Sequence, residues 1–252
     1  DIRAKLEQDP EGPSIIYIVP DQMTFQAELE LINTPNLGGM IRAQVFSFSR
    51  LAWKVLQETG GMGRQHLNNV GVNMVIRKIM EEKKSELKTF QRSSDKQGFI
   101  TQLSDLLKEC KRYCLTPEEI LNQSDEKVSP ILRSKLDDLS LLYNGFEHEL
   151  EGQYVDSEDY FNLLVEKMPE SDYLRNAEIY VDGFYSFTTQ EYGIMAGLMQ
   201  HCKNVTVSLT LDKPFKEQAP DPLHLFRMTG ETYFDLYQIA LQNGIKVEED
   251  RL

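Results

Sequence analysis

The sequence lacks any long apolar run. A membrane-spanning helix needs roughly 20 consecutive apolar residues, and no stretch of the 252 residues approaches that length. The first ten residues, DIRAKLEQDP, contain no apolar signal-peptide region. We therefore expect a cytoplasmic protein with no membrane partner. The sequence starts at Asp1 without an initiator methionine, which predicts a piece of a longer protein.

Cysteine and histidine are scarce, which limits metal and redox chemistry. The three cysteines, Cys110, Cys114 and Cys202, cannot form a disulfide framework, so a reducing compartment is predicted. Cys110 and Cys114 are four residues apart on a helical stretch, but no histidine or further cysteine lies nearby to complete a metal site. None of the four histidines lies at metal-ligand spacing from another candidate. The sequence therefore predicts no metal site.

Motifs for nucleotide hydrolysis and nucleophilic catalysis are also missing. No GxxxxGK[ST] phosphate loop occurs, and no Ser-His-Asp or Cys-His arrangement can be argued. A short apolar strand ends in Asp182 and Gly183. At this place nucleotide-hydrolysing motors usually have a metal-binding aspartate and then a glutamate that orients or deprotonates the attacking water. Because glycine can do neither, the pair is predicted to be a degenerate acidic motif, and no catalytic residue is expected.

Acidic residues are scarce in one part of an otherwise acidic chain. The net charge of -13 argues against unspecific nucleic-acid binding by the chain as a whole. Residues 31–80, however, hold one acid, Glu58, against six bases. The bases are Arg42, Arg50, Lys54, Arg64, Arg77 and Lys78. This window predicts a locally positive surface, although apolar strand and helix content also depletes acids.

Pairs of acids occur elsewhere on helical stretches, where solvated faces are the expected location. The pairs are Asp137 with Asp138, Glu118 with Glu119, and Glu158 with Asp159.

Hydrophobic patterning predicts an α/β fold. Residues 14–19 and 43–48 are apolar, β-branched runs typical of buried parallel strands, and each leads into a helical stretch. Asp21 is predicted to cap the first helix and Ser49 the second. Such repeated strand-to-helix joints are typical of a doubly wound sheet. Further expected elements are strands at residues 179–181, 205–211 and 245–247, and helices at residues 189–201 and 231–243.

The middle of the chain has a helical pattern. After the glycines at 60–63, apolar residues recur at helical spacing and no convincing strand follows until about residue 171. Thr116, followed by Pro-Glu-Glu, is typical of a helix start with a capping threonine and a glutamate three residues on. We therefore predict an all-helical insertion at 61–171 within an α/β domain formed by 1–60 and 172–252.

Polar, cationic and aromatic residues follow the predicted strands, where ligands bind in open α/β sheets. They are Gln22, Thr24, Phe48, Arg50, Trp53 and Phe184. Aromatic rings stack bases and polar groups read base edges, so this set suits single-stranded nucleic acid. A structural role is an equal alternative for the aromatics, since Phe48 could point into the core and Trp53 could pack its helix on the sheet.

Several sequence blocks resemble the amino-terminal region of the AddB family, the helicase-like subunits of the AddAB helicase-nucleases of Firmicutes. The blocks are IIYIVPDQMTFQAE, GGMIRAQVFSFSRLAWKVLQETGG, SDKQGF, KRYCLTPEEI, EIYVDGFYSFTTQE and LFRMTGETY. The resemblance covers essentially all 252 residues. A more distant similarity connects the chain to superfamily 1 helicases, in which VFSFSRLAW resembles the TFHSLA-like motif and VDGF replaces the acidic motif.

The resemblance implies a fold and a role. The α/β part would be a RecA-like, superfamily 1 helicase-like 1A subdomain without its first strand and phosphate loop, and the insertion would be 1B-like. The protein would pair with AddA, the motor subunit, in a heterodimer that resects duplex DNA ends for recombinational repair. The helicase-like half would not translocate but would scan single-stranded DNA for the Chi hotspot. ATP with Mg²⁺ and an iron–sulfur cluster are implied for the complete protein or complex, and no cofactor for this chain.

The resemblance also assigns DNA contacts. They fall by motif on Gln22, Thr24, Phe48, Arg50, Trp53 and Phe184, with Asp21, Arg42 and Ser49 as neighbours. Other interpretations stay open: a scaffold that only docks AddA, an ATP-binding helicase module in the intact protein, or an ATPase or nuclease in its own right.

Overall fold

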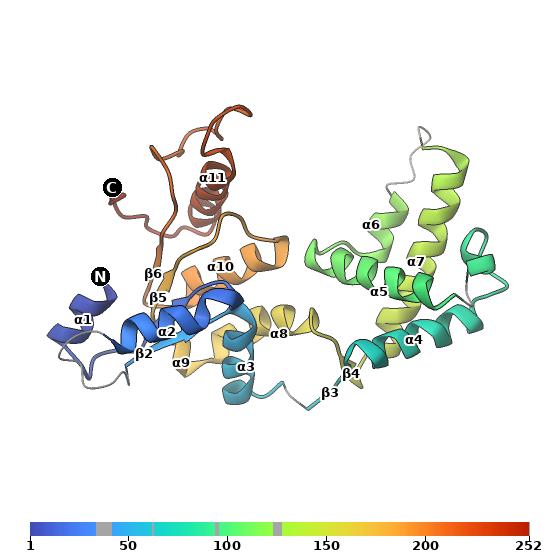
Figure 1. The fold of residues 1–252 in the computed structure, drawn as a ribbon, viewed down its shortest axis with the longest axis horizontal. Coiled ribbons are helices and arrows are strands. Elements are labelled where there is room, and N and C mark those ends of the chain that lie inside the picture. The colour runs from blue at the N-terminus through green and yellow to red at the C-terminus, as the bar shows by residue number, and fades with distance from the viewer. Residues whose placement is uncertain (34–41, 62, 94–95, 123–127, 252) are drawn as a thin grey trace. The chain divides into compact units, whose positions relative to one another are not determined.

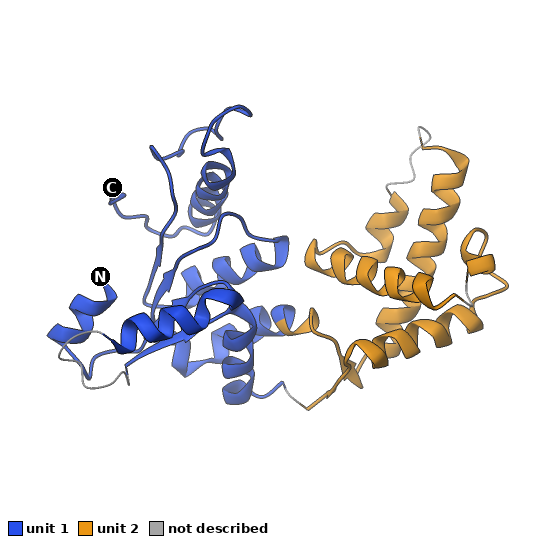
Figure 2. Cartoon of the chain, viewed as in Figure 1, with its two compact units in different colours: residues 1–61, 161–252 blue, residues 62–160 orange. Residues whose placement is uncertain are grey.

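The chain folds into two compact units (Figure 2). Unit 1 contains residues 1–61 and 161–252, and unit 2 contains residues 62–160. The structure, a computed structural model, describes residues 1–33, 42–61, 63–93, 96–122 and 128–251. Within these ranges no helix is both long and apolar enough to cross a bilayer. The assignment of the chain to helicase subdomains stays a prediction.

Unit 1 is built on a four-stranded parallel sheet with the strand order β2-β1-β5-β6 (Figure 1). The strands are β1 (Ile15–Ile18), β2 (Ala43–Phe46), β5 (Glu178–Val181) and β6 (Asn204–Val207). Ile15 lies opposite both Ala43 and Glu178, so β1, β2 and β5 end at the same level. The predicted α/β class with a parallel sheet is confirmed, while the RecA-like assignment stays a prediction.

Burial follows the strand order. The isoleucines of β1 and all four residues of β5 are buried, which is typical of strands covered on both faces, whereas residues of the edge strand β6 are partly exposed. Helices precede, connect and follow the strands, and a 3-10 turn, η1 (Asp21–Met23), lies after β1. They are α1 (Ile2–Gln8), α2 (Thr24–Ile32), α3 (Phe48–Thr59), α8 (Asp159–Lys167), α9 (Asp172–Arg175), α10 (Thr189–His201) and α11 (Arg227–Gln242).

Two predicted helix caps and one predicted strand are wrong. Asp21 opens η1, so α2 starts only at Thr24 and has no side-chain cap. Ser47, not Ser49, caps α3, because β2 ends at Phe46 and Ser47 is the extended residue that accepts the backbone N–H of the first turn. Residues 245–247 form no strand, since the N–H of Ile245 closes the end of α11 instead.

One buried carboxylate fastens α1 to the sheet. Glu178, the first residue of β5, accepts hydrogen bonds from Lys5 of α1 and, at 3.0 Å, from Lys203. The hydrogen bond from Lys5 is the main reason that the pKa of Glu178 lies below its usual value. Leu6 is buried against Ile15 of β1, so α1 has both ionic and apolar contacts with the sheet.

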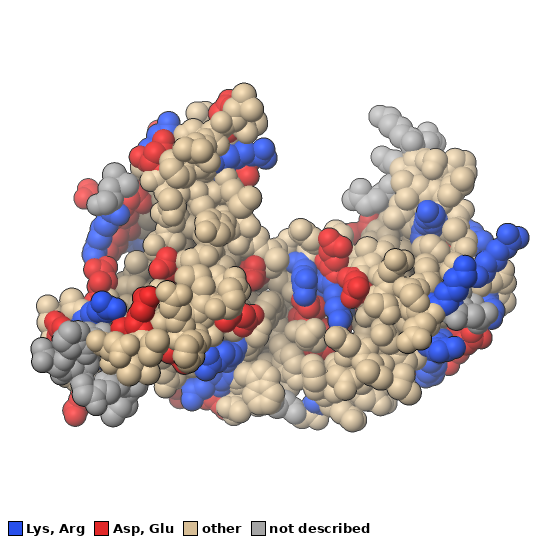
Figure 3. Space-filling model, in the orientation of Figure 1, with Lys and Arg blue, Asp and Glu red and all other residues tan. Residues whose placement is uncertain are grey.

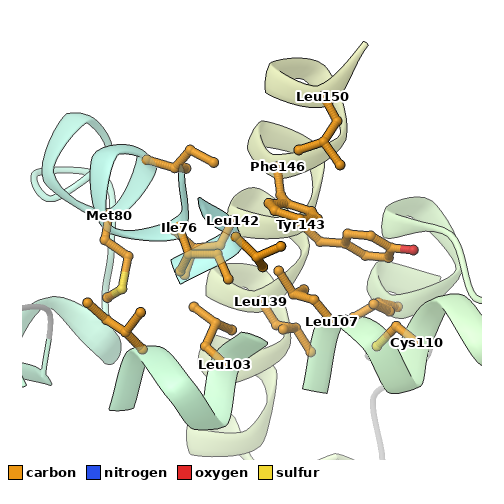
Figure 4. Packing of buried hydrophobic residues seen from close by; sticks show 14 of the residues in the cluster. Ile76, Met80, Leu103, Leu107, Cys110, Leu139, Leu142, Tyr143, Phe146 and Leu150 are labelled. Carbon is orange, nitrogen blue, oxygen red and sulfur yellow. The ribbon is translucent and has the colours of Figure 1, made fainter. Parts of the chain in front are cut away.

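Unit 2 is a helical unit around its own hydrophobic core, in which Phe146 and Leu142 of one helix face Ile76 and Leu107 of two others (Figure 4). Its helices are α4 (Asn69–Glu82), η2 (Phe90–Ser93), α5 (Gln97–Arg112), α6 (Pro117–Asn122) and α7 (Pro130–Leu150). The predicted start of α6 is confirmed, because Thr116 and Glu119 exchange side-chain to backbone hydrogen bonds of 2.8 and 3.2 Å.

The expectation that unit 2 has no strand is wrong. A short parallel pair, β3 (Gln65–His66) and β4 (Tyr154–Val155), joins the two ends of the unit. Two-residue strands carry too few residues to show a period in the sequence, so only their pairing reveals them.

Some acids that were expected on solvated faces are buried. The carboxylate of Asp138 accepts hydrogen bonds of 2.7–2.9 Å from three successive backbone N–H groups at residues 88–90. Glu158 is buried and pairs with Arg112 at 3.0 Å. The prediction that Asp138 and Glu158 lie on solvated faces is therefore wrong. Helical spacing in the sequence does not show whether a loop with unpaired N–H groups, or a cation, lies opposite an acid.

Lys111 is a buried cation at the centre of an acidic cluster. Its Nζ lies 2.9 Å from Asp156, 2.7 Å from Asp159 and 3.0 Å from Glu147. Burial alone would lower the pKa of Lys111, but the surrounding carboxylates raise it. The cluster therefore ties α5 to α7 and to the segment before α8.

We expect Glu178→Gln to loosen α1. The variant keeps the shape of the side chain but loses the charge that two lysines contact, which we expect to lower local stability by roughly 1–3 kcal/mol. Because the pKa of Glu178 is depressed in the folded state, its contribution is complete above the unfolded pKa of about 4.3 and is lost as the pH falls below that value. Peptide-resolved hydrogen exchange of the complete protein should show faster exchange in α1 for the variant. Urea unfolding should show a smaller loss of stability on acidification than in the unsubstituted protein, and an equal loss in both would contradict the assignment.

Lys111→Met should unfold unit 2 more readily. The substitution leaves the carboxylates of Asp156 and Asp159 without their cation, and removing one partner of a buried pair costs about 3–5 kcal/mol. Lys135→Met, on the exposed side of α7, is the matched control and should change the stability by less than about 0.5 kcal/mol. Hydrogen exchange of α5 and α7 compares the Lys111→Met variant with the Lys135→Met control. Equal protection in both variants would show that the cluster adds no net stability.

Candidate nucleic-acid interface

A hollow of about 200 Å³ opens at the carboxyl ends of three strands. Asp21 and Gln22 follow β1, Phe48 and Ser49 follow β2, and Phe184 follows β5. Parallel strands of equal register end at the same edge of the sheet, which is why residues so far apart in sequence line one hollow. The remaining lining residues are Val19, Pro20, Ser47, Phe161 and Glu191.

Aromatic rings form the apolar part of this hollow. The ring centroid of Phe48 lies 5.3 Å from that of Phe184 and 6.5 Å from that of Phe161. The ring centroid of the buried Phe187 lies 5.1 Å from that of Phe184. Phe48 is only 3% exposed, so it supports the cluster from within, whereas Phe184 and Phe161 keep part of their surface in the hollow. Rings at these separations stabilise one another and hold a fixed wall.

A second depression, of about 320 Å³, runs along α3 beside the hollow. Its lining includes Arg50, Trp53 and Lys54, and Ser49 lines both depressions. Trp53 is 49% exposed, so it does not serve only to pack α3 on the sheet. We call this second depression the α3 groove; its other lining residues are Phe46 and Gln57.

Two of the predicted contacts, Thr24 and Arg42, line neither depression and have structural partners. The hydroxyl of Thr24 donates to the carbonyl of Asp21 at 2.9 Å, and Thr24 lines neither depression. The guanidinium of Arg42 donates to the backbone carbonyls of Lys5, Asp9 and Pro13 at 2.6–3.1 Å, so it holds the turn after α1. The seven others, Asp21, Gln22, Phe48, Ser49, Arg50, Trp53 and Phe184, line one or both depressions. Their role in DNA binding stays a prediction.

Residues that the sequence did not single out also line the two depressions. Phe161 and Glu191 lie more than one hundred residues from Gln22, and no local pattern marks them as lining residues of this hollow. Lys54 was visible only as one base among several in an acid-poor window. Its ammonium lies 5.3 Å from the ring centroid of Tyr173, a cation–π contact that orients it at the groove.

The local positive charge that the acid-poor window predicted is partly compensated in the fold. Arg50 pairs with Glu28 at 3.1 Å, and Lys78 pairs with Glu149 at 2.6 Å. Figure 3 shows acidic and basic side chains interspersed among neutral ones over much of the visible face of unit 1. A ligand at the α3 groove therefore meets single cations.

The degenerate acidic motif has a structural use. Asp182 accepts a hydrogen bond from the hydroxyl of Tyr17 at 3.0 Å and another from the N–H of Gly183 at 2.8 Å. Burial, together with the charge of Asp182, raises the pKa of Tyr17 to about 12, so the phenol stays protonated and donates at neutral pH. Each carboxylate oxygen of Asp182 thus accepts one hydrogen bond, and together they hold the side chain in place at the end of β5.

Gly183 is required by its backbone and by its surroundings. Its φ of +80° lies in the left-handed region, and a Cβ there would meet the sulfur of Met23 at 2.8 Å and Cδ of Pro20 at 3.2 Å. A glutamate at this position would meet the same backbone strain and the same contacts.

The groups needed for the implied cofactors are not assembled here. Within the described ranges no three His, Cys, Asp or Glu residues are grouped as metal ligands. Burial raises the pKa of Cys202 to about 12 and also raises the pKa values of Cys110 and Cys114, so the three thiols are protonated at neutral pH. The sequence has no GxxxxGK[ST] phosphate loop, and the cofactor assignments stay predictions.

Comparison with known families identifies the chain. The family described as ADDB, N-terminal, matches residues 1–252. The chain belongs to this family. The family resemblance predicted from the strand-end motifs is therefore confirmed.

Curated relatives of this ADDB amino-terminal chain are named as the B subunit of an ATP-dependent helicase/deoxyribonuclease. The relative from Geobacillus kaustophilus is 53% identical over 99% of the chain. The relative from Bacillus licheniformis is 51% identical over 100% of the chain, and that from Bacillus subtilis is 50% identical over 98% of the chain. In each case the chain covers 22% of the relative, so it spans about a fifth of the length of these proteins.

Gly183→Ala tests the loop of this ADDB amino-terminal chain. The left-handed φ and the contact with Met23 should make the variant less stable by about 1–3 kcal/mol. Gly193→Ala in α10, where a Cβ meets no atom within 4 Å, should be neutral or stabilising by up to about 1 kcal/mol. Thermal unfolding and hydrogen exchange of the β5 loop provide the comparison. Similar stability of the two variants would contradict the constraint.

Proposed function

We propose that this chain is the helicase-like amino-terminal region of an AddB protein, and that it binds single-stranded DNA without translocating and recognises the Chi hotspot. The observation that carries the proposal is the convergence of Gln22, Phe48, Phe184 and Asp21 on one hollow, with Arg50 and Trp53 in the adjoining groove. The complete protein would act with AddA in a helicase-nuclease that processes duplex DNA ends during double-strand break repair. The names of the relatives, which are subunits of an ATP-dependent helicase/deoxyribonuclease, support this setting.

The side-chain chemistry supports a single-stranded ligand. A base stacked on an exposed aromatic ring such as Trp53 contributes roughly 1–3 kcal/mol. Arg50 and Lys54 supply two cations for phosphates along the same groove. The amide of Gln22 and the carboxylate of Asp21 are exposed polar groups at the hollow, and polar groups of this kind distinguish base edges.

The same geometry supports a binding role in which the motor chemistry lies elsewhere. Asp182 is engaged by Tyr17, and Gly183 occupies the position of the base. A protein with this site would recognise DNA that a partner translocates, and AddA would supply that movement. ATP with Mg²⁺ and an iron–sulfur cluster would belong to other parts of the complete protein or complex.

A scaffold that docks AddA is the second candidate, and one observation favours it. Phe25, Leu29 and Ile32 project from α2 at helical spacing and are 74%, 47% and 56% exposed. An apolar stripe of this kind on a helix is typical of a protein contact. Docking through α2 and DNA binding at the strand ends are compatible, because the two sets of residues do not overlap.

Trp53→Ala in the complete complex tests the proposal. We expect the hotspot response to fall about tenfold or more, because one stacked base is lost, while the unwinding rate is unchanged. The measurement is unwinding and cleavage of duplexes with and without the hotspot, using Tyr113→Ala, an exposed aromatic of unit 2, as the control. A parallel loss of unwinding would instead assign Trp53 to the fold or to docking of the partner.

A further inference from the structure

Lys54 of α3 lacks the carboxylate partner that its place in the helix predicts. Glu58 follows it by four residues, and oppositely charged side chains at this spacing on a helix can form an ion pair. Among the described residues, however, no carboxylate pairs with Lys54, and its ammonium lies 5.3 Å from the ring centroid of Tyr173.

We infer that Tyr173 is a positioning residue: it holds Lys54 for a backbone phosphate of the single strand, while Glu58 is kept away from that lysine. The contact would grip the strand whatever its sequence. This inference rests on the proposed function and adds a residue outside the two depressions to it.

Both carboxylate oxygens of Glu58 are engaged by the start of α9. Oε2 accepts a hydrogen bond from the hydroxyl of Ser171 at 2.5 Å, and Oε1 accepts one from the backbone N–H of Tyr173 at 3.0 Å. Ser171 in turn caps α9, because its side chain accepts the N–H of Leu174. Since Glu58 is held in this way, it does not neutralise the lysine one turn before it.

The ring of Tyr173 is fixed from two sides. Its hydroxyl donates to Oε1 of Gln44 in β2 at 2.8 Å, and its backbone N–H is bound by Glu58. Burial, together with the charge of Glu58, raises the pKa of Tyr173 to about 12, so the phenol is neutral at neutral pH. A neutral ring attracts the ammonium of Lys54 but accepts none of its charge, and the N–H donors remain able to bind a phosphate.

Arg50, the other cation that lines the α3 groove, is placed differently. It pairs with Glu28 at 3.1 Å, so a phosphate that binds Arg50 competes with a carboxylate. A phosphate that binds Lys54 displaces no carboxylate of the described residues. Phosphate contacts position a strand but carry no sequence information, so Lys54 should contribute equally to hotspot and other strands.

A double-mutant cycle on the complete protein in its complex tests the inference. The probe is a fluorescent oligothymidylate of about 15 nucleotides, titrated at several salt concentrations. We expect Lys54→Met to weaken binding and to reduce the slope of log K against log salt by about 0.7, the value for one phosphate of a single strand. Tyr173→Leu should weaken binding about two- to fivefold when Lys54 is present and should have no further effect in the Lys54→Met variant.

Two further variants serve as controls. Tyr173→Phe keeps the ring and should restore most of the binding that Tyr173→Leu loses. Tyr237→Leu in α11 removes a ring that also lies under a lysine, Lys216, at 5.8 Å, and it should leave binding of the strand unchanged.

A merely structural role of Tyr173 would give a different result. An equal loss of binding from Tyr173→Leu with and without Lys54 would show that the ring only packs α9 on α3, and would overturn the inference. An unchanged salt slope in Lys54→Met would overturn it as well, and both results would leave single-strand binding intact. Failure of the unsubstituted complex to bind the strand would instead contradict the proposed function.

Discussion

The in-register parallel pairing of β1 with β2 and with β5 is the constraint on which the candidate interface depends. It brings Pro20, Ser47 and Asp182 to one edge although more than 130 residues separate the last two. A shift of one residue in either pairing would turn every side chain of that strand to the other face. The isoleucines of β1 are buried on both faces of the sheet, so such a shift would disrupt their packing on each face. Hydrophobic burial in the sheet therefore fixes the geometry of a polar site at its end.

Buried ionic groups then hold the helices that the sheet alone does not position. Glu178 joins α1 to β5 in unit 1, and Lys111 joins α5 to α7 in unit 2. Each charge costs free energy to bury and is offset only by several well-placed partners. Lys5 and Glu147 lie more than 30 residues along the chain from the charges they contact, so these contacts specify tertiary arrangement and not local structure.

The loop after β5 is held by its own hydrogen bonds. Asp182 lies directly after the strand, and its oxygens accept hydrogen bonds from Tyr17 and from the N–H of Gly183. The left-handed turn at Gly183 brings the loop against Met23 and Pro20. The residue after this turn, Phe184, contacts Phe48, so the turn also contributes to the aromatic wall.

The sequence by itself determined the α/β class, the positions of the four strands, the helical middle of the chain and the family, because these depend on local periodicity and on long motif blocks. It did not determine whether Phe48 is buried and Trp53 exposed, since both are aromatic residues that suit either location. Nor did it show that Arg42 is held by three carbonyls, or that Phe161 and Glu191 line the hollow. Only the tertiary structure decided these points, because the partner of a side chain is set by the pairing of segments distant in sequence, and no local pattern encodes that pairing.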